Sequence, residues 1–491
     1  MMNYLLPILV LTPLIMGLFL LNPFFPNEEK LIRRTTKGFS IFHFILTMIT
    51  LLLFDFTNLG QSLEYSIPWI NALGINFSLA LDTISMLMVV LTSFIFIIAI
   101  YISKNLIKKS YQLYYALLLI LQTAILGIFT STDLFLFFLF WELELIPMYI
   151  LLLKWGSANK TKTATKFILY TFLGSIFILI GFILMYMFNF LYTGNFDANI
   201  YSLDVSTMNN TLALVIFTLL FIGFGIKLPI LPLHSWLPDA HSQAATPVSI
   251  ILSSILLKIG AYGIFKFNFE LFNETFTQLS TFIMILACIN IIYASFCAVI
   301  QKDLKRIIAY SGIAHMGIFL LALSAMNEIG FTGAIYTIIS HALISAGLFI
   351  IAGLIYKKCG TKNILKLNGI GVKMPILMNL SIPIILAAIG VPMFAGFISE
   401  FLSFTGAMLS DNKVISLLAI TSVIISSIYI LRFFHSIFFG ELPDKFKKIY
   451  DINTHQKVIL VAIILLILYF GIFPSTLTNI ISDYIISGGN I

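Results

Sequence analysis

Apolar residues occur along this chain in long runs that recur at short intervals, with polar residues confined to the gaps. A helix rises about 1.5 Å per residue, so about 20 apolar residues cross a hydrocarbon layer of about 30 Å. The runs therefore predict about fourteen transmembrane helices. They lie at 4–22, 39–55, 78–102, 112–130, 132–153, 166–188, 211–233, 246–268, 277–300, 304–325, 330–356, 375–408, 413–438 and 456–475.

Composition supports a membrane setting. Hydrophobic residues make up 60% of the 491 positions and charged residues only 10%, against about 25% in soluble domains. No Ser-, Pro- or Gly-rich linker and no charged block separates the runs. We therefore expect an all-α polytopic membrane protein in which residues 1–491 form a single transmembrane domain surrounded by the lipid bilayer.

The loops between the predicted helices alternate in charge. All but four of the 28 Lys and Arg residues fall in every second loop, as expected where basic residues stay on the cytoplasmic side. Because this basic excess (+7) is spread over many loops, it predicts no nucleic-acid-binding face. The opposite loops are acidic, and both termini are expected on that side. The acidic loop residues are Asp55, Glu64, Asp133, Asp197, Asp204, Glu270, Glu274, Glu328 and Asp411, with Lys266 and Lys413 among them.

Five charged residues are expected at mid-depth in the membrane, near the middle of a predicted helix or beside a helix break. A charge at the centre of a bilayer costs roughly 2.5–3.5 kcal/mol on insertion scales, so such residues are normally paired and functional. They are Glu142, Glu144, Lys227, Lys258 and Glu400. Two positions on a helix correspond to a turn of about 200°, so Glu142 and Glu144 cannot both face the same partner. Static ion pairs that lock helices together are one interpretation, and a proton or cation relay is the one that we favour.

Two of the predicted helices contain residues that break a helix. Pro229 and Pro232 stand late in the seventh, and Pro392 and Gly396 stand in the twelfth. Broken backbone at membrane depth is tolerated where it lines a hydrated cavity or is buried in protein. Transport folds place such discontinuous helices at equivalent points of two inverted repeats. We therefore expect a first five-helix repeat over 112–268 and a second over 277–438.

Burial disfavours the charged form of a lysine, and a nearby carboxylate favours it. Moving a carboxylate towards or away from Lys227 would therefore switch that lysine between holding and releasing a proton. Histidines that titrate near neutral pH lie in or beside the same zone, and we expect His315 and His341 to face each other. The four histidines are His234, His241, His315 and His341.

Metal and cluster chemistry finds no support in the sequence. No zinc-type ligand spacing occurs, and the cysteines Cys288, Cys297 and Cys359 are too few and too scattered to hold an iron–sulfur cluster. No Gly-x-Gly-x-x-Gly motif follows a strand, so no dinucleotide site is expected. We propose no metal and no bound cofactor for this chain.

Four motifs carry a resemblance to a known family. They are Trp141-Glu-Leu-Glu-Leu-Ile-Pro147, Ala164-Thr-Lys-Phe-Ile-Leu-Tyr-Thr171, the block from Lys227 through His234 and His241 to Lys258, and Arg306-Ile-Ile-Ala-Tyr-Ser311 with His315-Met-Gly317. With these motifs the chain resembles, over nearly its whole length, the antiporter-like subunit 4 of proton-pumping NADH:quinone oxidoreductase, which is respiratory complex I. This subunit is also called subunit M, and the photosynthetic relatives of the complex have a plastid-type counterpart.

The resemblance implies fourteen helices with two inverted five-helix repeats, and a function as a proton-translocating subunit. It implies that Glu142 is the modulating carboxylate, Lys227 its partner, Lys258 the central relay lysine and Glu400 the outlet carboxylate. Glu144 and the four histidines would be accessory groups. NADH, flavin, iron–sulfur clusters and quinone would be bound in partner subunits, both membrane and peripheral.

The expected location is an energy-coupling membrane, first the bacterial inner membrane, with the mitochondrial inner and thylakoid membranes as alternatives. A sodium/proton antiporter of the related kind and a membrane-bound hydrogenase subunit are competing functions. The identity of the co-purifying partners distinguishes the three.

Overall fold

The computed structural model describes residues 4–56, 62–104, 106–107 and 109–488. Its backbone divides into two compact units. The first contains residues 1–227, 258–276 and 483–490, and the second contains 228–257 and 277–482.

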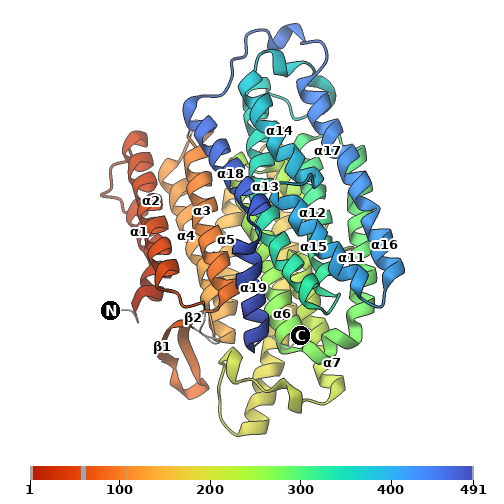
Figure 1. Ribbon diagram of the computed structural model, residues 1–491. Coiled ribbons are helices and arrows are strands. Elements are labelled where there is room, and N and C mark those ends of the chain that lie inside the picture. Colours follow the sequence, from red (N-terminus) through yellow and green to blue (C-terminus); the bar gives the residue numbers. More distant parts are fainter. Residues whose placement is uncertain (1–3, 57–61, 105, 108, 489–491) are drawn as a thin grey trace. The chain divides into compact units, whose positions relative to one another are not determined.

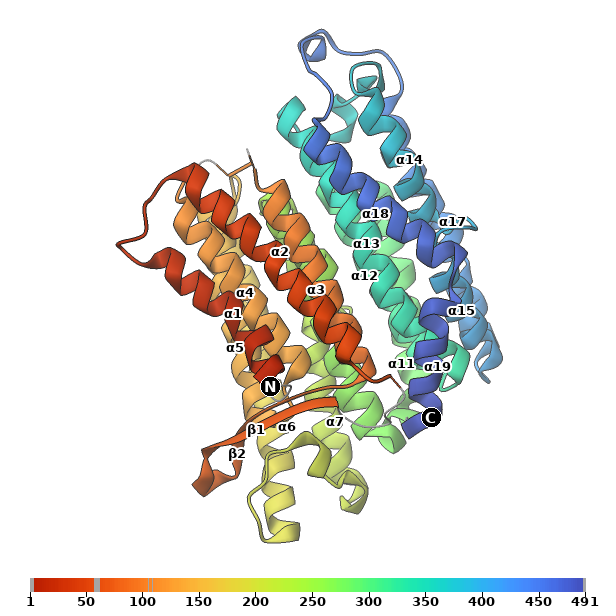
Figure 2. The same cartoon turned by 60° about the vertical axis from the view of Figure 1, so that its left-hand side comes forward.

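In the first unit a row of long helices carries a small β-hairpin at one end (Figures 1 and 2). Helix α4 packs between α1 and α5, α2 packs on α3, and α6 packs on both α5 and α7. The elements are α1 (Leu5–Leu21), α2 (Glu29–Leu53), β1 (Ser62–Ile70), β2 (Ile75–Leu81), α3 (Thr83–Ile102), α4 (Tyr111–Thr130), α5 (Leu134–Trp155), α6 (Lys160–Thr193), α7 (Asn210–Lys227) and the π-helical segment η6 (Ile264–Leu271).

The second unit is built around α13, which packs against α12, α14, α15 and α18. Its elements are α8 (Trp236–Gln243), α9 (Thr246–Ile251), the π-helical segment η5 (Leu252–Leu256), α11 (Asn273–Ile300), α12 (Leu304–Leu323), α13 (Glu328–Cys359), α14 (Pro375–Ile389), α15 (Ala395–Leu409), α16 (Lys413–Ile420), α17 (Ser422–Phe438), α18 (Thr454–Ile472) and α19 (Ser475–Gly488). Helix α10 (Leu257–Gly263) joins η5 to η6, so that residues 246–271 form one continuous helical span.

The predicted helices are confirmed. Twelve helices among the described residues are long and apolar enough to cross a membrane. Helix α1 and the interrupted pair α14–α15 correspond to the two remaining predicted spans. Several helices extend further than the apolar runs, because hydropathy marks only the part in hydrocarbon while charged turns continue into the headgroup region. The two inverted repeats stay a prediction.

The sequence pattern did not predict the β-hairpin, nor the helices α8 and α19. β1 and β2 pair antiparallel around a turn that ends at Gly74. Gly74 has a φ of +58°, and a Cβ there would approach the Phe196 carbonyl oxygen to 1.9 Å. The position therefore requires glycine. The apolar strand β2 (Ile75–Leu81) runs directly into α3, so the alternation of inward and outward residues that is typical of a strand could not be recognised. Its last residues were predicted as the first turn of the helix.

Asp133 ties this hairpin to α5. One carboxylate oxygen accepts from the backbone N–H groups of Phe135 (2.9 Å) and Leu136 (3.1 Å), and the other accepts from the N–H of Asn76 (2.9 Å). The side chain thus caps the start of α5 and holds β2 against it.

We expect Asp133→Ala to destabilise the first unit by about 2–3 kcal/mol, because the variant loses a helix cap and leaves buried donors unpaired. Thermal unfolding in detergent, followed by tryptophan fluorescence, measures the loss. Asp204→Ala is the matched control, since that aspartate caps only a short exposed turn. Equal transition midpoints for the two variants would contradict the role given to Asp133.

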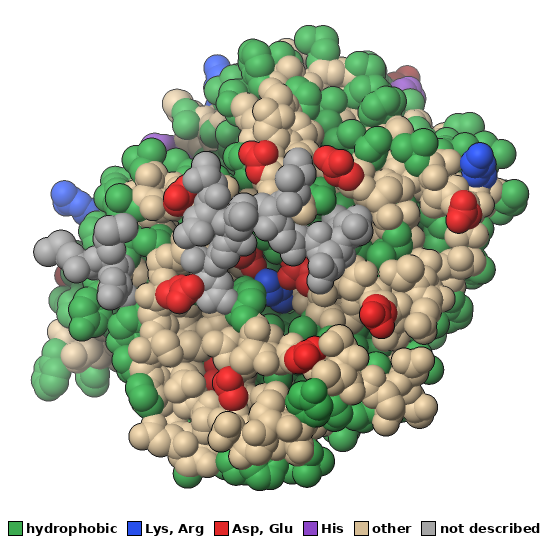
Figure 3. All heavy atoms as spheres, turned by 60° about the horizontal axis from the view of Figure 1, so that its bottom comes forward, with side chains coloured by type: hydrophobic (Ala, Val, Ile, Leu, Met, Phe, Trp, Pro, Cys, Tyr) green, Lys and Arg blue, Asp and Glu red, His purple; other side chains and the backbone are tan. Residues whose placement is uncertain are grey.

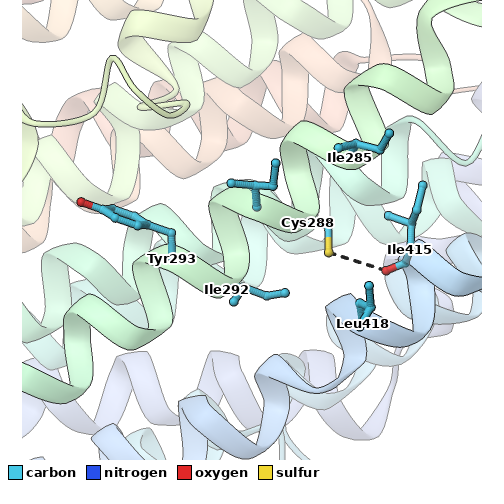
Figure 4. Close-up of a pocket in the computed structure, with 7 residues that line it drawn as sticks. Ile285, Cys288, Ile292, Tyr293, Ile415 and Leu418 are labelled. Atoms are coloured by element: carbon cyan, nitrogen blue, oxygen red, sulfur yellow. Dashed lines mark hydrogen bonds between the residues drawn. The ribbon is translucent and has the colours of Figure 1, made fainter.

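A groove on the second unit is apolar throughout. It has a volume of about 460 Å³ and lies between α11 and α16, lined by Ile285, Cys288, Tyr293, Ile415 and Leu418 among others (Figure 4). The Cys288 thiol lies 3.7 Å from the Ile415 carbonyl oxygen. Because no charged side chain lines the groove, it suits hydrocarbon contact.

Candidate functional site

In the first unit, the structure pairs a lysine with a carboxylate in the interior. Lys227 is the last residue of α7, and its ammonium donates a hydrogen bond to Glu144 of α5. Both side chains are at most 1% exposed. The ammonium also lies 5.4 Å from the ring centroid of Trp141 and 5.9 Å from that of Phe167. Aromatic rings therefore surround the ion pair. Because the pair is buried, salt in the solvent screens its attraction much less than it would screen an exposed pair.

The carboxylate that Lys227 contacts is Glu144, so the pairing with Glu142 implied by the resemblance is wrong for this structure. Glu144 shares the inward face of α5 with Phe137 and Trp141, at the spacing of one helical face. Glu142 is half-buried, on the stripe that includes Leu139 (41% exposed) and Ile146 (59% exposed). The sequence indicated that the two glutamates diverge, and the aromatic residues preceding them show which one turns inward.

The predicted break after Lys227 is present. Helix α7 ends at Lys227, residues 228–235 form turns that contain Pro229 and Pro232, and α8 follows. His234 lies in these turns with its ring 5.3 Å from that of Tyr293, and His241 of α8 stacks on Phe349 at 4.5 Å. Both histidines are buried among aromatic rings.

Lys258 occupies the interior of the long helical span 246–271. Its side chain is 0% exposed, and its helical neighbours Leu256, Leu257 and Ile259 are fully buried as well. The expectation that Lys258 is buried is confirmed, and its depth in the membrane and its role as the central relay group stay predictions.

The second unit brings three of the predicted residues together. His315 of α12 and His341 of α13 stack with ring centroids 5.0 Å apart, which confirms that they face each other. His315 Nε2 lies 3.7 Å from Glu400 Oε1 on α15, and Nδ1 lies 2.8 Å from the Ser311 carbonyl oxygen. All three side chains are buried. This cluster contains two rings that can carry a proton and a carboxylate that can accept one.

The second predicted break positions Glu400. Helix α14 ends at Ile389, residues 390–394 include Pro392, and α15 begins at Ala395, so that Gly396 lies in its first turn. Gly390 has a φ of +80°, and a Cβ there would lie 2.5 Å from a Glu400 carboxylate oxygen. The glycine therefore gives the carboxylate room beside the interrupted backbone.

Charged residues in the matched motifs hold α8 to α12. Asp239 forms an ion pair of 2.5 Å with Arg306, and Asp303 accepts from Ser242 Oγ at 3.0 Å. Lys305 donates to the Ala244 carbonyl oxygen (2.7 Å), at the end of α8, where a cation complements the helix dipole. These contacts fix the short helix that follows the first break.

Sequence reasoning missed a further buried cluster in the first unit, which we call the acidic-side cluster: Asp82, Lys266, Glu270 and Tyr484. Lys266 lies 2.9 Å from both Asp82 and Glu270, and Tyr484 donates a hydrogen bond to Glu270. Lys266 and Glu270 were expected in a loop, but the helix continues as η6, which buries Lys266 and leaves Glu270 partly exposed. The spacing of Lys258, Tyr262, Lys266 and Glu270, four residues apart each time, was the signal that could have revealed it.

Asp82 precedes α3 and caps it through the Ser85 N–H at 2.7 Å. Burial alone would raise the pKa of Asp82, but the Lys266 ammonium and the hydrogen bonds from Ser85 outweigh it and leave that pKa below its usual value. The cluster lies at the end of the unit that carries the hairpin, where Asp and Glu are the prevailing charged side chains (Figure 3). Because its pKa is lowered, the Asp82 carboxylate is ionised at neutral pH, and Lys266 is its charge partner.

Helices broken at membrane depth and buried, hydrogen-bonded charges together define a membrane ion-transport protein. A family model described as NADH:quinone oxidoreductase/Mrp antiporter, transmembrane, matches residues 131–426. The chain belongs to this family.

Curated relatives match the chain over almost its full length. NADH-quinone oxidoreductase subunit M of Rickettsia prowazekii (strain Madrid E) is 37% identical over 488 residues, which cover 97% of each chain. NAD(P)H-quinone oxidoreductase chain 4 2 of Thermosynechococcus vestitus is 37% identical over 484 residues, which cover 96% of this chain and 90% of that one.

Solved structures share the fold. A chain of respiratory complex I from Thermus thermophilus matches with a TM-score of 0.88 and 26% identity, over 98% of this chain and 99% of that one. A chain of the Mrp complex from Dietzia sp. matches with a TM-score of 0.87 over 98% and 96%, but at 19% identity this match concerns the fold alone.

Proposed function

We propose that this chain is a proton-translocating membrane subunit of an NADH:quinone-type oxidoreductase. The observation that carries the proposal is the buried ion pair of Lys227 and Glu144 at the end of an interrupted helix. A static anchor does not require a charge pair at membrane depth beside broken backbone, whereas a group that takes up and releases protons does. The 37% identity to subunit M and chain 4 proteins supports the choice of assembly.

The chemistry follows from the pair. While Glu144 stays against Lys227, the ammonium is stabilised and the lysine keeps its proton. When the carboxylate moves away, the uncompensated ammonium is unfavourable in this setting, and its proton passes to the next group. We propose Lys258 as that next group and the His315–His341–Glu400 cluster as a later station. Glu142, half-buried on the outer stripe of α5, would be an accessory carboxylate.

The redox reaction belongs to the partners in this proposal. NADH, flavin, iron–sulfur clusters and quinone would be bound by other membrane and peripheral subunits, and this chain would bind none of them. Its setting would be an energy-coupling membrane of the bacterial or thylakoid type, as the sources of the curated relatives suggest. The antiporter alternative is supported by the family model, whose description includes the Mrp antiporter, and by the shared fold with the Mrp chain.

Purification of the chain in a mild detergent from its native membrane tests the proposal. We expect it to co-purify with peripheral flavin and iron–sulfur proteins, and the complex to acidify one side of proteoliposomes when NADH and a soluble quinone are supplied. Membrane partners alone, with sodium-dependent proton exchange and no NADH oxidation, would contradict the proposed function in favour of an antiporter.

A further inference from the structure

The helix that holds Lys258 carries polar side chains at every fourth position towards the acidic end of the first unit. Tyr262, Lys266 and Glu270 follow Lys258 at this spacing, which places them along one helical face. The last two lie in the π-helical segment η6, and π-helical turns occur frequently at functional sites. Polar groups therefore continue from the buried lysine to the edge of the unit.

Hydrogen bonds join this face to the start of α3. The Tyr262 hydroxyl lies 2.9 Å from the Ser85 hydroxyl, and the backbone N–H of Ser85 donates to the Asp82 carboxylate at 2.7 Å, which places the two side chains at the start of α3 next to each other. Asp82 lies 2.9 Å from Lys266, which lies 2.9 Å from Glu270. Each of these groups bears an exchangeable proton or accepts one.

Exposure increases along the series. Asp82 and Lys266 side chains are 7% exposed, and the Glu270 side chain is 21% exposed. Two tyrosines contact the carboxylates: the Tyr201 hydroxyl lies 3.5 Å from Asp82, and the Tyr484 hydroxyl donates a hydrogen bond to Glu270. Glu270 is thus the member that meets water.

The charges also fit a transfer route better than an anchor. Two carboxylates surround one ammonium, so the ionised cluster has a net charge of −1. A lock between helices needs only one carboxylate to pair with Lys266, and the second one, on the partly exposed Glu270, leaves the cluster with an unbalanced charge. A cluster that accepts a proton in passing is neutral while it holds that proton.

We propose that Tyr262, Ser85, Asp82, Lys266 and Glu270 form the route by which protons pass between Lys258 and water on the acidic side of the membrane, with Glu270 as the terminal group. This inference rests on the proposed function. In this proposal a proton that leaves Lys258 would cross the one helical turn to Tyr262 through a water molecule. The Tyr262 and Ser85 hydroxyls each take one proton and pass one on. Asp82 receives it, Lys266 gives a proton to Glu270 and takes the one on Asp82, and Glu270 releases its proton to water.

The test uses the assembled complex in proteoliposomes, with NADH oxidation and acidification measured together. We expect Tyr262→Phe and Glu270→Gln each to lower the protons moved per NADH by about tenfold. Glu270→Asp should recover most of the activity. Glu274→Gln, which changes an exposed carboxylate four residues beyond Glu270, is the matched control and should behave as the parent complex.

A readout that depends on sidedness separates a route from an anchor. In Glu270→Gln, acidification should lose its dependence on the pH of the acidic-side compartment and keep its dependence on the other. An unchanged dependence would mean that the acidic-side cluster is a static anchor. If the Glu270 variant fails to assemble, Tyr262→Phe, which keeps the aromatic ring and removes only the hydroxyl, provides the test. Parental proton transfer in this variant would contradict the route.

The failure of this inference can be told from the failure of the proposed function. Parental proton transfer in Tyr262→Phe and Glu270→Gln, together with loss in Lys227→Met, would place the route elsewhere and leave the proposed function intact. Parental transfer in Lys227→Met as well would overturn both.

Discussion

Replacing Lys227 by methionine is expected to lower redox-driven proton transfer by about tenfold or more while the complex still assembles. Methionine replaces the unbranched stem of the lysine with an apolar chain one heavy atom shorter, so most of the packing is kept while the contacts of the ammonium with Trp141 and Phe167 are lost. The charge partner of Glu144 is lost, however, and a lone buried carboxylate costs about 3–5 kcal/mol relative to the pair. That carboxyl group therefore keeps its proton, and the pair has no second group with which to exchange it.

The measurement is acidification per NADH oxidised in proteoliposomes, with assembly checked by native gel electrophoresis. Lys162→Met is the control, because Lys162 is exposed in the first turns of α6 of the same unit. If Lys227→Met moved protons as well as the Lys162 variant does, the ion pair would be a structural contact only.

The same assay decides between the two glutamates. Glu144→Gln is expected to reproduce most of the loss seen for Lys227→Met, and Glu142→Gln is expected to be milder, because Lys227 contacts Glu144. The resemblance gave the opposite order. A larger loss in Glu142→Gln would restore the implied pairing and mean that Lys227 changes partner during turnover.

The number of helices and their breaks could be predicted because each depends on local properties. A run of about 20 apolar residues has one stable conformation in hydrocarbon, and a proline such as Pro392 has no backbone N–H to donate and so favours an interruption of the helix. The β-hairpin could not be predicted in the same way. Its strand β2 is apolar and continuous with α3, so periodicity over seven residues was too short to distinguish strand from helix.

The residues of the site could be predicted from the sequence, but the partner of each charged residue could not. A charged residue within an apolar run is easy to recognise in a sequence, and because such a residue is costly in a membrane, it indicates a function. Lys227, Lys258 and Glu400 were identified in this way. Which carboxylate meets which lysine depends on helix rotation, and hydropathy does not report it. Asp82 was missed because it fell among the first residues of the predicted helix 78–102, and the structure shows that it instead caps α3 and contacts Lys266.

Glu400→Gln is expected to have an effect comparable to that of Lys227→Met, again about tenfold or more on proton transfer. Glutamine has the same shape, so the packing of α15 beside the break is preserved. Because an amide takes up no proton near neutral pH, the stacked His315 and His341 lose the acceptor that lies 3.7 Å from His315. Glu441→Gln, an exposed position in the same unit, should leave acidification per NADH unchanged.

Gly390→Ala tests the same station without removing a titratable group. A Cβ at this position would lie 2.5 Å from the Glu400 carboxylate, so that carboxylate must move away, and the φ of +80° adds strain for alanine. If transfer depends on the distance between Glu400 and His315, proton transfer falls severalfold while NADH oxidation and assembly persist. Gly440→Ala also places alanine at a positive φ, +98°, but the nearest atom is 3.6 Å away, so it reports the backbone strain alone. Equal transfer in the two glycine variants would show that the position of the carboxylate does not matter, and Glu400 would then have no part in moving the proton.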